Sequence, residues 1–221
     1  IPAPKIYEEI APDGKYYFTA YDMVQVELQK IGQSSVVNPY EFGKINIFNE
    51  YFGRGLSSIV FQELRESRSL AYSAYVSYAA ANLKDKHNYI TAYIGTQPDK
   101  LVIANDAIND LMENFPLIEN QFQNAKNTIL KQIASGRINR QNIFFKNYNQ
   151  KKLGIFHDLR EDIYKQVGEM EMEDLNKFYQ EEIQNVKYNT ALMGNLKDIL
   201  KADPSLESRL EVLSLEELFN Y

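Results

Sequence analysis

The spacing of hydrophobic residues changes several times along this chain, and these changes restrict the fold more than any other feature of the sequence. Val24, Val26 and Leu28 alternate with polar residues, which is the period of a half-buried strand. From residue 39 to about residue 51 the apolar side chains recur at helical spacing, and from Ala71 the alternation returns. A chain that switches between the two periods in this way predicts a domain that contains both strands and helices.

The predicted elements follow one another in a simple order. One or two strands lie within residues 16–31, and a polar loop at 84–88 joins two later strands into an antiparallel hairpin. With the strands in one sheet and the helices on one face, the fold class is α+β, a mostly antiparallel sheet packed against several helices. The remaining predicted elements are helices at about 39–51, 56–68, 101–115, 118–133, 142–153, 160–167 and 171–182, and a last strand at 186–193.

A single domain accounts for most of the chain. We expect residues 15–200 to form it, residues 1–14 to be an extended, Pro-containing lead-in, and residues 201–221 to be a C-terminal tail packed on the domain. The chain begins Ile1-Pro2-Ala3-Pro4 rather than with Met. We therefore expect either a piece of a longer protein or a processed terminus.

Composition excludes several classes of function. The chain has no Cys, so disulfides, Cys-ligated metals and thiol catalysis are not available to it. Its 24 Lys and Arg against 30 Asp and Glu give a net charge of −6, which argues against a nucleic-acid binder. No apolar run reaches the roughly 18 residues of a membrane span. His87 and His157 each lack a second His one helical turn away, so we expect no metal site in this chain.

The most informative segment joins a helix to a strand at residues 65–72. Arg65 and Arg68 close the predicted helix at its C-terminal end, where cations suit the helix dipole, and Tyr72 opens the next strand. A guanidinium and a phenol held near one another could bind a carbonyl or a developing oxyanion. On spacing alone, the simpler interpretation is favoured: a helix end with surface ion pairs and a half-buried Tyr.

This segment resembles the hallmark of the non-catalytic domain of the pitrilysin/insulinase-type zinc metallopeptidases, which are related to the mitochondrial processing peptidases. The matching residues read Gly-x-Gly-Leu-Ser-Ser-x-x-Phe-x-Glu-Leu-Arg-Glu-x-Arg-x-Leu-Ala-Tyr-Ser and run from Gly53 to Ser73. The order of strands and helices is similar over nearly the whole chain. Two residues depart from the family pattern, because Arg54 interrupts its usual Gly run and Ser69 replaces the Gly common before Leu-Ala-Tyr.

The resemblance implies a metallopeptidase domain of the LuxS/MPP-like type that is inactive alone and forms part of a zinc metalloendopeptidase. A partner domain, in the same or a separate chain, would carry His-x-x-Glu-His and the zinc, so no cofactor is expected in this chain. Arg65 and Tyr72 match the family pair that stabilises the substrate and the transition state from the opposite side of the chamber. Arg68 is expected to assist in binding the peptide substrate.

Two other functions remain open. Some relatives of such peptidases serve as scaffold or assembly proteins without peptidase activity, and this chain could be one of them. It could also be a stand-alone module that holds extended peptides by strand addition to a sheet edge. The absence of Cys fits the cytosol, a mitochondrion or the bacterial periplasm, and we expect the periplasm or the cell envelope.

Overall fold

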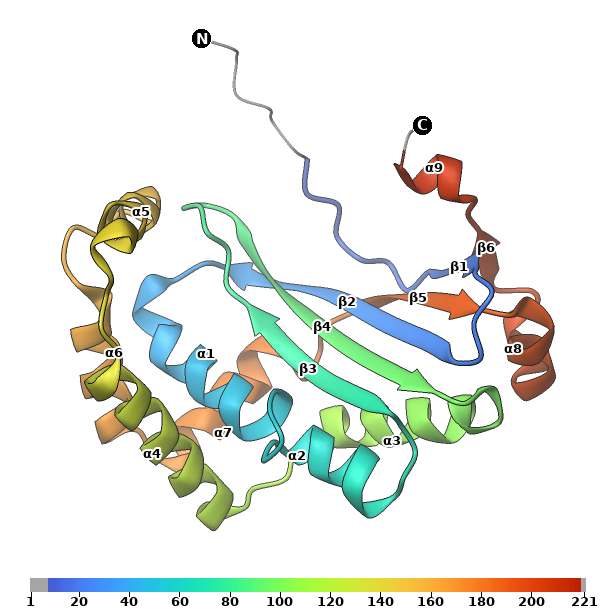
Figure 1. The fold of residues 1–221 in the computed structure, drawn as a ribbon, viewed down its shortest axis with the longest axis horizontal. Helices are drawn as coiled ribbons and strands as arrows, with labels where there is room; N and C mark the ends of the chain where they lie inside the picture. The colour runs from blue at the N-terminus through green and yellow to red at the C-terminus, as the bar shows by residue number, and fades with distance from the viewer. Residues whose placement is uncertain (1–7, 220–221) are drawn as a thin grey trace, which may run out of the picture.

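The computed structural model describes residues 8–219, which form one six-stranded sheet with helices beside it (Figure 1). The strand order across the sheet is β3-β4-β2-β5-β1-β6. Strands β3, β4, β2 and β5 pair antiparallel, whereas β5 with β1 and β1 with β6 pair parallel. The strands are β1 Tyr16–Ala20, β2 Val26–Val36, β3 Ser73–Ala79, β4 His87–Thr96, β5 Tyr188–Gly194 and β6 Leu210–Val212.

Most of the helices gather on one side of the sheet, and the C-terminal helix lies over part of the other face, which is otherwise open (Figure 1). They are α1 Phe42–Phe48, α2 Ile59–Phe61, α3 Leu101–Glu113, α4 Glu119–Ser135, α5 Arg140–Lys152, α6 Leu159–Glu169, α7 Met172–Glu182, α8 Leu196–Ala202 and α9 Leu215–Phe219. Wider π-type turns continue α1 through Asn49–Gly53 and α2 through Gln62–Ser67. Among the described helices, none combines the length and hydrophobicity that a membrane crossing requires.

The alternation along each strand decides which face of the sheet is buried. On β2, Val26 and Leu28 point toward the helices and are buried, while Glu27 and Gln29 lie on the open face. Beneath β3 and β4 the core is aromatic, and the rings of Phe48 and Phe52 lie 5.3 Å apart. A second, smaller core beneath β1 and β5 contains Phe18, Val26, Leu28, Leu101, Leu192, Ile199 and Leu206.

The structure confirms the predicted α+β class, the hairpin and the long helices. It differs from the sequence interpretation at three places. Val24, which was assigned to a half-buried strand, is 90% exposed, and Leu56, the first residue of the predicted helix at 56–68, is 72% exposed, because each lies in a turn before its element begins. Helix α8 was not predicted, and Asn195 caps it by accepting a hydrogen bond from the Lys197 amide. Residues 210–212, which were expected to belong to a surface tail, pair with β1 as β6.

The lead-in is tied to the domain at two points. The side-chain oxygen of Asn189 on β5 accepts hydrogen bonds from three successive backbone amides, Asp13, Gly14 and Lys15, at 2.9–3.0 Å. Farther from β1, the Glu9 carboxylate lies 3.0 Å from Nδ1 of His87 and also accepts from the His87 amide. The chain therefore enters β1 along a defined path.

Candidate functional site

The segment with the Arg and Tyr begins at a capped helix. The Ser58 hydroxyl accepts a hydrogen bond from the Phe61 amide and so caps the N-terminus of α2. The helix then widens into π-type turns and ends at Arg68. Leu64 is fully buried, and its carbonyl accepts a hydrogen bond from the Leu70 amide at 2.8 Å. This bond turns the chain back toward the sheet directly after the helix.

The turn at residues 69–71 is fixed by contacts with the end of β4. Ser69 has φ 49°, in the left-handed region that favours glycine, although it carries a side chain. The Lys100 ammonium donates to the Ser69 carbonyl at 3.0 Å, and the Thr96 hydroxyl donates to the Leu70 carbonyl at 2.6 Å. The Tyr72 amide donates a hydrogen bond to the Gly95 carbonyl at 2.8 Å. These bonds hold the backbone that carries Tyr72 against β4.

Arg65 and Tyr72 line the same hollow in the surface. It has a volume of 290 Å³, and its wall also includes Ser69, Leu70, Ala71, Gln97 and Lys100. The Gln97 side-chain amide donates to the Tyr72 phenol oxygen at 2.8 Å, so the phenol proton is left to donate to a ligand. Tyr72 is 51% exposed. The hollow thus combines two cations with an accessible hydroxyl donor.

The Arg65 guanidinium is only loosely held. It lies 4.9 Å from the centre of the Phe61 ring, and its Nε is 3.9 Å from the Glu66 carboxylate. A contact at that distance, between side chains that are about half exposed, contributes little to stability. The guanidinium is therefore free to turn toward an oxygen atom placed in the hollow.

Arg68 lies at the same helix end but does not line the hollow. Its Nε is 3.6 Å from the carboxylate of Glu63, one turn earlier in the helix. Lys100 and Gln97, by contrast, line the hollow and were not singled out from the sequence. Neither belongs to a recognisable motif, and both reach the site only because β4 ends beside the turn at Ser69.

The outer edge of β3 is covered over much of its length. The Asn49 side chain both accepts from the Tyr78 amide and donates to the Tyr78 carbonyl, at 2.8 and 2.9 Å. At Gly53 an added Cβ would lie 1.9 Å from the Val76 carbonyl oxygen, so the helix backbone touches the strand there. Strand addition at this edge would have to displace the end of the first helix.

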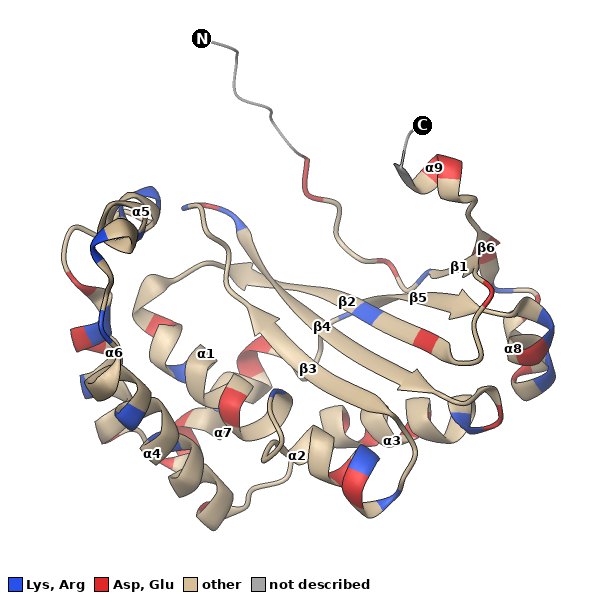
Figure 2. Cartoon of the chain, in the orientation of Figure 1, with Lys and Arg blue, Asp and Glu red and all other residues tan. Residues whose placement is uncertain are grey.

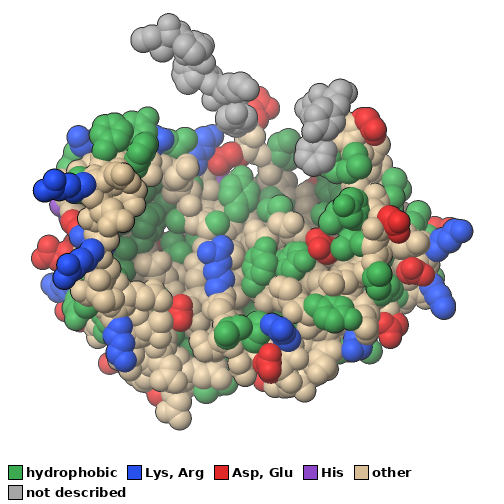
Figure 3. Space-filling model, viewed as in Figure 1, with side chains coloured by type: hydrophobic (Ala, Val, Ile, Leu, Met, Phe, Trp, Pro, Cys, Tyr) green, Lys and Arg blue, Asp and Glu red, His purple; other side chains and the backbone are tan. Residues whose placement is uncertain are grey.

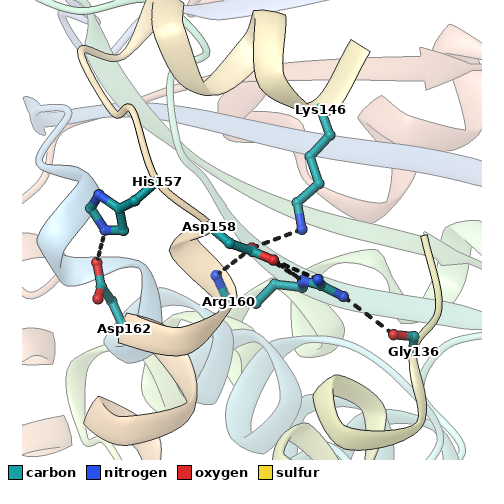
Figure 4. A network of polar contacts seen from close by, with 6 residues as sticks. All are labelled: Gly136, Lys146, His157, Asp158, Arg160 and Asp162. Carbon is teal, nitrogen blue, oxygen red and sulfur yellow. Dashed lines mark hydrogen bonds and ion pairs between the residues drawn. The ribbon is translucent and has the colours of Figure 1, made fainter. Parts of the chain in front are cut away.

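Each of the two His residues contacts a carboxylate, His87 that of Glu9 and His157 that of Asp162. Figure 4 shows His157 with Asp162, and next to them the Asp158 carboxylate between Lys146 of α5 and Arg160 of α6. The Arg160 guanidinium, helped by Lys146, holds the pKa of Asp158 well below its usual range although burial opposes this. Within residues 8–219, no group of three or more His, Asp or Glu side chains is arranged to hold a metal ion.

Comparison with known proteins gives one family match and several similar structures. A sequence model of the family described as "Peptidase M16 inactive domain" matches residues 3–129, which is more than half of the chain. No curated protein matches the chain.

The similar structures share the fold at low sequence identity. A peptidase M16 inactive domain from Pseudomonas fluorescens has a TM-score of 0.71 at 16% identity, over 87% of this chain and 46% of that one. The periplasmic protease PqqL from Escherichia coli has a TM-score of 0.64 at 14% identity, over 84% of this chain and 21% of that one. A chain of complex III from Candida albicans has a TM-score of 0.62 at 13% identity, over 94% of this chain and 54% of that one. This chain spans about half the length, or less, of these structures.

Proposed function

This chain belongs to the family of peptidase M16 inactive domains, and on that premise we propose that it is the substrate-holding half of a zinc-dependent metallopeptidase. A catalytic half with His-x-x-Glu-His and the zinc would face it across a chamber, in the same or a separate chain. In this proposal residues 15–200 form one domain, and the tail at 201–221 completes its sheet. We place the protein in the bacterial periplasm or cell envelope, and the periplasmic protease PqqL, which has a similar fold, supports this.

The observation that carries the proposal is that Arg65 and Tyr72 line one hollow. Peptide hydrolysis passes through a tetrahedral intermediate with negative charge on the former carbonyl oxygen. A guanidinium and a phenol that point into the same space would donate hydrogen bonds to that oxygen or to the neighbouring peptide backbone. Lys100 adds a second positive charge to the wall. Arg68 would contact the substrate only if its guanidinium moved away from the Glu63 carboxylate.

The proposal is tested by Arg65→Ala and Tyr72→Phe in the complete peptidase. Loss of one such donor lowers the rate by about 10²–10³-fold, so we expect kcat to fall by roughly that factor in each variant. Zinc content and the unfolding temperature should stay at wild-type values, since both side chains are about half exposed. The matched controls are Arg137→Ala and Tyr40→Phe, at exposed positions outside the hollow. Wild-type turnover in both site variants would rule out the proposed role.

A scaffold role is the second candidate, and the similarity to a complex III chain favours it. A scaffold would bind its partner tightly without binding peptide. The same two variants distinguish the candidates, because a scaffold would keep its partner affinity when Arg65 or Tyr72 is changed and would show no peptide cleavage at all.

A further inference from the structure

A second hollow lies on the open face of the sheet, between the strands and the C-terminal segment. Its volume is 250 Å³. Leu215 and Leu218 of the C-terminal segment form part of its wall although they are 45% and 47% exposed. Hydrophobic side chains gather on this side of the molecule, beneath α9 (Figure 3). The other lining residues are Tyr17, Thr19, Glu27, Gln29, Tyr93, Ala191, Leu192, Met193 and Leu213.

The strand register connects this hollow to the hollow at Tyr72. Ser73, the residue after Tyr72, pairs with Gly95, Gly95 with Glu27, and Glu27 with Met193. These residues form one row across β3, β4, β2 and β5, and their side chains belong to the open face. Gly95 has no side chain, and the Tyr93 hydroxyl and the Gln25 side-chain oxygen lie beside it, 3.1 and 3.4 Å from the place that a Cβ would take. An extended chain lying over this row would meet both hollows.

The distance between the two hollows matches the length of a short extended peptide. Three steps between neighbouring strands, at about 4.8 Å each, span roughly 14 Å. An extended chain advances about 3.4 Å per residue, so roughly four residues would cover this distance. A peptide whose backbone is held at Arg65 and Tyr72 would therefore present a side chain to the second hollow about four residues away.

Charge on this face favours an uncharged occupant. Strands β3, β4 and β5 contain no Lys, Arg, Asp or Glu, and β2 contains only Glu27 and Lys30 (Figure 2). Lys30 is buried on the helix side, so Glu27 is the one carboxylate that these four strands place on the open face. Burial raises the pKa of Tyr93 to about 12, and its hydroxyl donates to Glu27. The Glu27 carboxylate thus already accepts a hydrogen bond from within the protein.

We propose that the hollow between the open face and the C-terminal segment is a subsite for an apolar side chain of the peptide substrate, aromatic or aliphatic, about four residues from the part bound at Arg65 and Tyr72. This inference rests on the proposed function for its peptide ligand. A cavity of about 150 Å³ with an apolar lining accommodates a benzene ring, so the present volume is sufficient for one side chain. The bound side chain would cover the exposed parts of Leu215 and Leu218.

The test is peptide binding by the 221-residue chain, followed through the labelled methyl group of Met193. Unstructured peptides of about eight residues would carry Phe, Ala or Lys at one position and uncharged polar residues elsewhere. We expect the Phe peptide to bind about tenfold more tightly than the Ala peptide and to shift the Met193 signal. The Lys peptide should bind no more tightly than the Ala peptide. Equal affinity for Phe and Ala, or preference for Lys, would overturn the subsite.

Substitutions in the wall of the hollow test whether the preference for Phe arises there. Leu218→Asp should abolish the preference for Phe, and Ala191→Leu should do the same by filling the hollow without adding charge. Val212→Asp is the matched control, because Val212 is apolar, 60% exposed and outside the hollow. The Met193 signal should not change with protein concentration before peptide is added. If it does change, a second copy of the chain covers the hollow, and the proposal of a peptide subsite is wrong.

Arg65→Ala distinguishes failure of the subsite from failure of the proposed function. It should weaken the Phe and Ala peptides by the same factor and leave their ratio unchanged. If Arg65→Ala weakens both peptides but the wild-type chain shows no preference for Phe, the subsite fails and the proposed function stands. If the preference for Phe is present and Arg65→Ala has no effect, the role of Arg65 fails while the subsite stands.

Discussion

At the scale of single residues, Lys30 is the least expected feature of the sheet. It lies on β2 on the helix side and is only 7% exposed, and its ammonium donates to the side-chain oxygen of Asn109 on α3. Burial lowers the pKa of Lys30 to about 8, although Asp106 and Glu113 favour the charged form. A charge held in this position costs stability, because water solvates the ammonium better in the unfolded chain.

The lowered pKa of Lys30 predicts a dependence of stability on pH. Between pH 8 and about 10.4 the unfolded chain holds more protons than the folded chain, so the free energy of unfolding should rise with pH in that interval. Below pH 8 the whole cost is present, up to about 3 kcal/mol. Lys30→Met should remove this rise, which urea unfolding at pH 7 to 9.5 measures. Lys131→Met on the exposed side of α4 is the control, and parallel curves for Lys30→Met and wild type would contradict the prediction.

At the scale of elements, one carboxylate ties the end of α7 to the sheet. A single oxygen of Glu182 accepts hydrogen bonds from the hydroxyls of Ser34, Ser35 and Tyr78, at 2.6, 2.6 and 2.7 Å. Asn88 of β4 donates to the same Tyr78 hydroxyl at 3.0 Å. Burial alone would raise the pKa of Glu182, but these hydrogen bonds more than offset it and hold the pKa below its usual value. Helix α7 is thereby joined to β2 and β3.

We expect Glu182→Gln to lower the free energy of unfolding by about 1–3 kcal/mol, because three hydroxyl donors, of which that of Tyr78 belongs to a buried side chain, lose a charged acceptor. The carboxylate contributes this stability above the pKa of an unfolded Glu, near 4.3, and loses it as the pH falls toward the lower folded value. The difference between wild type and variant should therefore shrink below pH 4. Glu181→Gln, at the exposed neighbouring position, is the matched control. A difference that is the same at pH 7 and pH 3.5 would show that the hydrogen bonds are not its source.

At the scale of the whole molecule, the chain presents an open sheet face and a helix that is not packed into the core. Helix α5 has no buried residues and exposes a cluster of aromatic side chains, while Lys146 anchors it to Asp158 (Figure 4). In the proposed function these surfaces are available to a catalytic half. Within the described residues no group of three or more His, Asp or Glu side chains could hold a metal ion, and the proposal assigns the zinc to that other half.

This division predicts complementation between two separately produced halves. Neither the 221-residue chain nor its catalytic partner should cleave peptides alone, and mixing them should restore turnover that a zinc chelator abolishes. The Arg65→Ala chain is the control, because it should associate with the partner yet restore about 10²–10³-fold less activity. Equal cleavage by the catalytic half with and without this chain would contradict the division.

The sequence by itself determined the alternation of strands and helices, the half-buried character of the strand that contains Val26 and Leu28, and the segment that carries Arg65 and Tyr72. These features follow from local periodicity and from residue types within a few positions of one another. Val24 and Leu56 were misassigned because an apolar residue in a turn continues the pattern of its neighbour without being buried.

Only the tertiary structure decided which distant segments share a surface. It brought Gln97 and Lys100 to the turn at Ser69, which no spacing in the sequence indicates. It also placed residues 210–212 beside β1 and formed the hollow over Met193 from strands far apart in the chain. The physical reason is that β5 pairs with β1 and β2, which are far from it in the sequence, and this pairing depends on burying one face of the whole sheet. Periodicity within a strand shows only on which face each of its residues lies.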